Sequence, residues 1–208
     1  MQLGYEAEDM SKESVIIEAA TRLFLRKGFS GVSMEEIARE AKVAKQTLYS
    51  YFNGKDDLFR AIIRAQSEAF FATLPHNDDS TQNIEEFLYV LGERAVDMLF
   101  RHDTLALYRV IVSETPRFPE LGKFYWQSGA QTFIDRLEAF LAGHGFSKER
   151  AQNATEQFLS FMFGTLLSKT LLNKDYHPSK EEKKAHTEQA VSTFFMLNGQ
   201  YVTEKPDP

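Results

Sequence analysis

The sequence predicts an all-α protein, with a group of short helices near its start and a longer helical bundle after it. Apolar residues recur at steps of three and four along almost the whole chain of 208 residues, which is the spacing of one helix face. The alternation typical of strands is nearly absent, and eleven glycines and six prolines mark the breaks. Because 43% of the residues are apolar, the chain can bury a core.

Composition and missing motifs exclude several classes of protein. Without cysteine there is no disulfide framework, thiolate metal site or cysteine nucleophile. The first ten residues do not form a secretory signal and no stretch is apolar enough to span a membrane, so we expect a cytoplasmic protein. The histidines lack metal-ligand spacing, and phosphate-loop and nucleophile-elbow motifs are missing. We therefore expect no metal, no cofactor and no enzyme, an unrecognised catalytic site being the alternative.

Two helix-start signals lie close together in the first forty residues. Ser11 can cap a helix whose apolar residues run from Val15 to Phe24 and which stops at Gly28. Ser33 and Glu36 have the spacing of a capping box, which predicts a second, short helix that ends near residue 42.

A third short helix, predicted from Ala44 to Phe52, has two different sides. One side can bury Val43, Leu48 and Phe52, whereas the other carries lysine, glutamine, hydroxyl and tyrosine side chains. The pair Asn53-Gly54 tolerates a left-handed backbone and ends the helix. A fourth helix then runs from residues 55–57 to about residue 73.

Two short helices joined by a tight turn form a helix-turn-helix, whose second helix enters the major groove of DNA. The whole chain carries a net charge of -6, but residues 42–55 contain three lysines and no acid, and such a local patch attracts phosphate. Lysine suits phosphate or guanine, glutamine suits adenine, and hydroxyl groups suit either backbone or bases. The predicted DNA-binding residues are Ser33, Lys45, Gln46, Thr47, Tyr49, Ser50, Tyr51 and Lys55. Ser33 and Lys55 lie at the starts of two helices, where free backbone amides can bind phosphate.

These residues also carry a family resemblance. The segments Gly28-Phe29, 32–38, 41–43, 47–52 and 55–58 resemble the DNA-binding domain of tetracycline-repressor-type (TetR) transcriptional regulators, in register over residues 12–64. Two positions depart from the common form: Gln46 stands where a small residue is frequent, and Tyr51 where histidine is frequent. The operator sequence therefore cannot be transferred from the family. The alternative, that these side chains only decorate a helical bundle, would leave DNA binding unchanged by their substitution.

The resemblance implies a helical C-terminal domain that binds a small molecule and forms a homodimer through its last two long helices. Independently, apolar residues predict helices over 84–100, 105–112, 124–141, 151–172 and 185–197, after a linker at 75–80. The segment 151–172 is apolar nearly all round, so one side must be covered by a partner or by the chain's own core. The predicted interface residues are Phe158, Met162, Thr165, Leu166, Phe194 and Leu197.

An effector pocket is expected in the same domain, because twelve of the eighteen phenylalanines lie beyond residue 80. The residues expected to line it are Tyr108, Arg109, Glu114, Tyr125, Trp126, Phe133 and Phe161. Each of them can instead be a core residue or an ion-pair partner, and Glu114 has the spacing to pair with Arg117. The string from Glu114 to Leu121 also resembles the C-terminal domain of a subset of these regulators. The charge of the effector stays open.

The sequence thus predicts a helix-turn-helix DNA-binding domain over residues 1–55 and an effector-binding and dimerisation domain over 56–208. The expected function is ligand-responsive repression at a palindromic operator in double-stranded DNA, which a small lipophilic effector relieves. Corepression is equally compatible with the physics of a ligand-shifted equilibrium. The alternative function, from another class of protein, is that of a DNA-associated regulatory module that has no small-molecule ligand.

Overall fold

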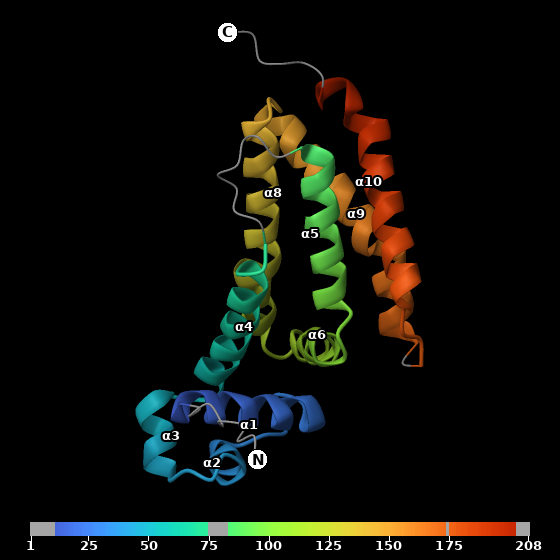
Figure 1. The fold of residues 1–208 in the computed structure, drawn as a ribbon. Helices are drawn as coiled ribbons and strands as arrows, with labels where there is room; N and C mark the ends of the chain where they lie inside the picture. Colours follow the sequence, from blue (N-terminus) through green and yellow to red (C-terminus); the bar gives the residue numbers. More distant parts are fainter. Residues whose placement is uncertain (1–10, 75–82, 174, 203–208) are drawn as a thin grey trace, which may run out of the picture. The chain divides into compact units, whose positions relative to one another are not determined.

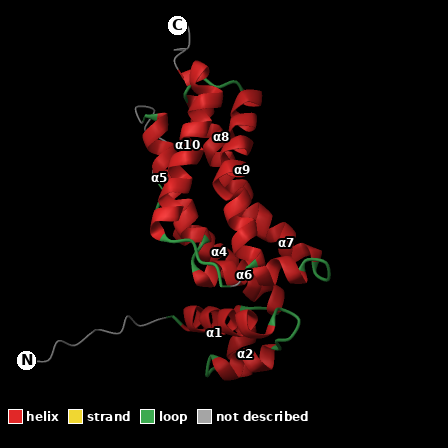
Figure 2. Ribbon diagram, turned by 90° about the vertical axis from the view of Figure 1, so that its right-hand side faces the viewer, coloured by secondary structure: helices red, strands yellow, loops and turns green. Residues whose placement is uncertain are grey.

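The computed structural model describes residues 11–74, 83–173 and 175–202, without the side chains of 201 and 202. Every regular element in these ranges is a helix (Figure 2), which confirms the predicted all-α class. The helices are α1 (Lys12–Lys27), α2 (Met34–Glu40), α3 (Lys45–Tyr51), α4 (Lys55–Phe71), α5 (Ile84–Leu99), α6 (His102–Glu114), α7 (Pro119–Tyr125), a π-helical turn (Trp126–Ala130), α8 (Gln131–Gly143), α9 (Lys148–Leu172) and α10 (Lys180–Val202). The expected linker at 75–80 and the first ten residues lie outside the described ranges.

The ends of the first two helices follow the predicted capping residues. The Ser11 hydroxyl accepts a hydrogen bond from the Ser14 amide at 3.2 Å, and Ser33 closes a capping box with Glu36. Helix α1 ends at Gly28, whose φ of 71° lies in the left-handed region that glycine adopts without strain. A Cβ at this position would lie only 2.8 Å from Glu114 Oε1, so space as well as conformation requires glycine.

The chain divides into two compact units, and the first contains the short helices. It joins the residues up to Gln66 with Ala106–Tyr125. Its core is formed by apolar side chains of α1, α2, α4 and α6, together with Leu48 of α3. At its centre the ring of Phe29 lies 5.4 Å from the rings of both Phe24 and Phe59, and 5.1 Å from that of Phe118.

The second unit joins Ser67–Leu105 with the residues from Trp126 onward. Helix α10 packs against α5 and α9, and α8 packs against α9, so that the long helices form a bundle (Figure 1). Gly92 allows a close approach of α5, because a Cβ there would meet the Thr187 methyl group at 2.9 Å and the Met162 Cε at 3.2 Å. No helix of the described chain is long and apolar enough to cross a membrane.

The largest difference between the C-terminal helices and the sequence expectation lies before α8. The single helix expected over 124–141 is instead α7, a π-helical turn and α8. The turn contains Ser128 and Gly129, which are poor helix formers, and the Trp126 indole N–H bonds the Gln131 side chain at 3.2 Å across it. Packing also keeps residues 56–66 and 106–125 with the N-terminal helices, whereas the functional boundary at residue 55 stays a prediction.

Candidate nucleic-acid interface

Helices α2 and α3 are joined by a turn of four residues, 41–44. Lys42 adopts a φ of 55°, and this left-handed residue reverses the direction of the chain. The amide of Val43 donates to the Ala38 carbonyl at 3.0 Å, and the amide of Lys42 donates to the Arg39 carbonyl at 3.2 Å. These bonds fix the two short helices as a helix-turn-helix.

Burial divides α3 into the two sides that the sequence predicts. Leu48 is completely buried and Phe52, which follows the helix, is 6% exposed, so these two side chains anchor α3 to the core. On the other side Tyr49 and Tyr51 are 43% and 45% exposed. Of the other predicted contacts on α3, Lys45, Gln46 and Ser50 are exposed and Thr47 is half-buried. The exposed side therefore combines cationic, amide, hydroxyl and phenol groups.

The two lysines predicted to contact DNA are both engaged within the chain. Lys45 Nζ lies 2.5 Å from Glu35 Oε1, and this hydrogen bond raises the pKa of Lys45 and lowers that of Glu35. The half-buried Lys55 donates to the Phe29 carbonyl at 2.9 Å, and its ammonium lies 4.8 Å from the centre of the Phe29 ring. Lys55 is thus held at the start of α4 and is also part of the fold.

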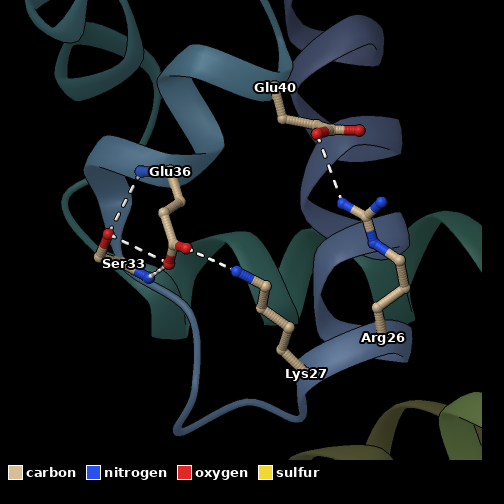
Figure 3. Close-up of polar contacts among 5 residues, drawn as sticks. All are labelled: Arg26, Lys27, Ser33, Glu36 and Glu40. Carbon is tan, nitrogen blue, oxygen red and sulfur yellow. Dashed lines mark hydrogen bonds and ion pairs between the residues drawn. The ribbon is translucent and has the colours of Figure 1, made fainter.

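Ser33 belongs to a polar network that links α1 to α2 (Figure 3). The Glu36 carboxylate accepts from the Ser33 amide at 3.0 Å, while the Glu36 amide donates to the Ser33 hydroxyl at 3.2 Å. The same carboxylate pairs with Lys27 at 2.7 Å, and Glu40 pairs with Arg26 at 3.4 Å. The start of α2 is therefore fixed by contacts that also orient the helix against α1.

Glu36 makes the stability of this network depend on pH. The hydrogen bond from Lys27 and that from the Ser33 amide lower the pKa of Glu36 from 4.5 to about 2. Because the folded pKa lies below the unfolded one, ionised Glu36 stabilises the fold above about pH 4.5, and this contribution is lost as the pH falls toward 2. We expect the melting temperature of Glu36→Gln to be lower than that of the wild type at pH 7 and the difference to shrink below pH 4.5. A difference that is constant in thermal melts from neutral to acidic pH contradicts this expectation.

Charge is distributed unevenly along the chain. Residues 11–55 carry eight basic and five acidic side chains, a net charge of +3, although the chain as a whole carries -6. Ion pairs with the acids of α2 occupy several of these cations, namely Arg22, Arg26, Lys27 and Lys45. Residues 11–55 nevertheless keep a net positive charge within an acidic molecule.

The structure does not bring the seven expected effector-lining residues into one unit. Tyr108, Arg109, Glu114 and Tyr125 belong to the first unit, and Trp126, Phe133 and Phe161 to the second. The rings of Tyr108 and Tyr125 lie 5.6 Å apart, and burial raises the pKa of Tyr125 to about 12. Phe133 is buried in the bundle core, whereas Trp126 and Phe161 are 54% and 42% exposed.

Glu114 has a different partner from the one its sequence spacing suggests. Its carboxylate accepts hydrogen bonds from the Ser30 amide at 3.2 Å and from the Ser30 hydroxyl at 3.0 Å. The Arg117 guanidinium lies 5.8 Å from the centre of the Phe118 ring and forms no ion pair with Glu114 among the described residues. The carboxylate therefore fixes the loop between α1 and α2, a contact 84 residues apart that local spacing cannot reveal.

The six expected interface residues separate into two groups. Phe158, Met162 and Phe194 are fully buried in the chain's own bundle, and Leu166 is 7% exposed, so these four face inward and cannot form a surface for a partner. Thr165 and Leu197 are exposed. Met196, an apolar residue that the sequence also places beside this interface but outside the set of six, is 80% exposed next to Leu197. No group of side chains in the described ranges could hold a metal ion.

A helix-turn-helix with a polar, basic exposed side defines the class of protein, a DNA-binding transcriptional regulator. Residues 16–62 match the model of bacterial regulatory proteins of the tetR family, and residues 86–197 match that of the C-terminal domain of AefR-like transcriptional repressors. The second match alone covers more than half of the chain, which therefore belongs to the TetR family of regulators, as the motifs of the first 64 residues indicate.

Individual relatives agree with this assignment. The probable HTH-type transcriptional regulator YttP of Bacillus subtilis is 35% identical over 108 residues, 50% of this chain and 51% of YttP. Among solved structures, the flavonoid-responsive regulator FrrA is 31% identical with a TM-score of 0.75, over 89% of this chain and 96% of FrrA. A TetR transcriptional regulator from Agrobacterium tumefaciens shares the fold, at 21% identity and a TM-score of 0.71, over 90% of this chain and 94% of that one. The chain spans between 22% and 51% of the length of the first curated relatives that it matches.

Proposed function

We propose that the chain is a homodimeric repressor that binds a near-palindromic operator through α3 and is released by a small lipophilic effector. The observation that carries DNA recognition is the exposed side of α3, which presents Lys45, Gln46 and two half-exposed tyrosines. In a helix-turn-helix this side faces base edges in the major groove. Binding to chromosomal DNA implies action in the cytoplasm.

Dimerisation is supported by apolar side chains that α9 and α10 leave uncovered. Phe161, Met196 and Leu197 are 42%, 80% and 46% exposed, and the neighbouring Gly164 and Gly199 have open space where a Cβ would stand. Two helices that each present large apolar groups beside glycine can pack closely against a second copy. A dimer places two recognition helices on half-sites roughly 34 Å apart, one turn of DNA.

The proposal that an effector binds is supported by a buried polar group without a hydrogen-bond partner, in the described part of the second unit. The Thr155 hydroxyl is completely buried, and in the described chain it has no hydrogen-bond partner. Buried polar groups are generally paired, so a bound molecule with a polar atom in an apolar frame can supply the missing partner. FrrA responds to flavonoids, which are planar, lipophilic phenols of this kind, and flavonoids are therefore the first class to test.

The effector acts by shifting a population between conformers. A ligand releases the operator if it binds more tightly to a conformer that cannot occupy both half-sites. Each increment of about 1.4 kcal/mol by which the ligand prefers this conformer changes the ratio of the two conformers tenfold. We expect a flavonoid or another lipophilic phenol to raise the melting temperature and to release DNA. If no compound of such a panel shifts the melting temperature and none changes repression, the alternative of a regulatory module without a ligand is favoured.

DNA recognition is tested by selecting duplexes from a randomised library with the purified chain, followed by footprinting. We expect enrichment of a near-palindrome, because α3 reads bases and the dimer repeats the reading. Gln46→Ala should relax preference at one base position and cost about 1–3 kcal/mol there, whereas Lys55→Ala should weaken binding to every duplex and reduce the salt slope by about 1.

The control for lysine removal is Lys123→Ala on α7, whose side chain is 62% exposed and pairs within its own helix. Thermal melts of all three variants separate loss of DNA contacts from loss of the Lys55 bond to Phe29. A library without any enriched motif at moderate ionic strength, or unchanged binding after both substitutions, refutes recognition through α3.

A further inference from the structure

An acidic side chain lies at the edge of the surface that α3 presents. Glu35, in the first turn of α2, pairs with Lys45, the first residue of α3, at 2.5 Å. Both side chains are more than half exposed, at 57% and 59%. A carboxylate this close to a phosphate-binding surface is unexpected, because it repels the DNA backbone.

The pair occupies the cation that α3 would offer to DNA. The Lys45 ammonium also lies 5.7 Å from the centre of the Tyr49 ring, so it is held between a carboxylate and an aromatic face. Among the ion pairs of the described residues, this one alone includes a residue of α3. While this pair is closed, Glu35 neutralises the charge that Lys45 would offer to a phosphate or a guanine.

We propose that Glu35 lowers the affinity of the chain for DNA of arbitrary sequence by keeping Lys45 in this ion pair. Contacts to phosphates provide nearly all of the binding to non-specific DNA, so one withheld cation weakens that binding most directly. At the operator, base contacts hold α3 in the major groove, where Lys45 can exchange Glu35 for a phosphate or a guanine. The free energy of these base contacts offsets the cost of the exchange. Glu35 thus sets the ratio of specific to non-specific binding. The proposal rests on the proposed function, in that α3 binds DNA.

The test uses the full chain and a mixed-sequence duplex, so that neither the operator nor the effector needs to be known. Glu35→Gln keeps the size of the side chain and removes its charge. We expect its affinity for this duplex to rise by about two- to fivefold, the range for releasing one exposed ion pair. Because Lys45 then neutralises one more phosphate, the slope of log K against log salt should steepen by about 0.9. Fluorescence anisotropy over a series of salt concentrations measures both quantities.

A matched control separates this effect from a change in net charge. Glu18 is 56% exposed and pairs with Arg22 of its own helix at 3.5 Å, so Glu18→Gln removes the same charge without releasing a residue of α3. We expect Glu18→Gln to leave the salt slope unchanged. In a Lys45→Gln background, Glu35→Gln should have no further effect, because the residue through which Glu35 acts is gone. Circular dichroism checks that each variant keeps the wild-type helix content.

The outcomes distinguish this inference from the proposed function. If the wild-type chain has no salt-dependent affinity for any duplex, DNA recognition through α3 fails and the role of Glu35 fails with it. If the wild type binds but Glu35→Gln has the same affinity and slope, only the inference is overturned. The same conclusion holds if Glu18→Gln reproduces the gain, or if the gain persists without Lys45.

Discussion

Replacing Phe29 with alanine is expected to lower the free energy of unfolding by about 3–5 kcal/mol, the usual range for a buried phenylalanine. Phe29 is only 2% exposed, and its ring contacts three others, those of Phe24, Phe59 and Phe118. These rings come from α1, α4 and the segment before α7, so the cavity cannot close by the movement of one helix. Chemical denaturation followed by circular dichroism measures the loss.

Tyr49→Ala provides the control for the change at Phe29. This side chain is of similar size and belongs to the same unit, but it is 43% exposed on the side of α3 that faces away from the core. We expect it to change stability by less than about 0.5 kcal/mol, as is usual for surface substitutions, while weakening DNA binding. Equal losses of stability for the two variants would mean that the ring cluster does not hold the helix-turn-helix in place.

The helix-turn-helix could be predicted almost completely from sequence because its determinants are local. A capping box, a glycine stop and the period of the apolar residues fixed α1 to α3, and the exposed positions of α3 followed from which residues must be buried. What the sequence could not show were contacts between distant residues. The Glu114 carboxylate bonds Ser30 instead of pairing with Arg117, and Glu35 pairs with Lys45 across the turn.

Four of the six residues predicted for the interface lie in the chain's own core, for a different physical reason. Helix α9 has apolar residues on nearly every side, so sequence periodicity cannot tell which stripe meets the chain's own bundle and which stays outside. The structure places Phe158 and Met162 inside and leaves Phe161 outside. Phe161, expected in an effector pocket, is therefore assigned to the surface proposed for the partner. The four buried residues Phe158, Met162, Leu166 and Phe194 belong to the core.

The double variant Phe161→Asp/Met196→Asp is expected to convert the proposed dimer into monomers and to weaken operator binding by about two orders of magnitude or more. Both side chains are substantially exposed in one copy, at 42% and 80%, so aspartate is solvated in the monomer but would be buried without a partner in a dimer. A monomer engages one half-site, and it loses the effective concentration that linkage gives to the second, a factor of about 10²–10⁴.

Sedimentation velocity and operator titration together measure both parts of this expectation. Val112→Asp on α6 is the control, because it also replaces an exposed apolar side chain, 53% exposed, with an acid but lies outside α9 and α10. We expect this control to sediment as the wild type and to keep its affinity. A double variant that still sediments as a dimer would place the contact between subunits elsewhere. A monomer with undiminished operator affinity would mean that each half-site is bound independently, which contradicts the proposed role of the dimer.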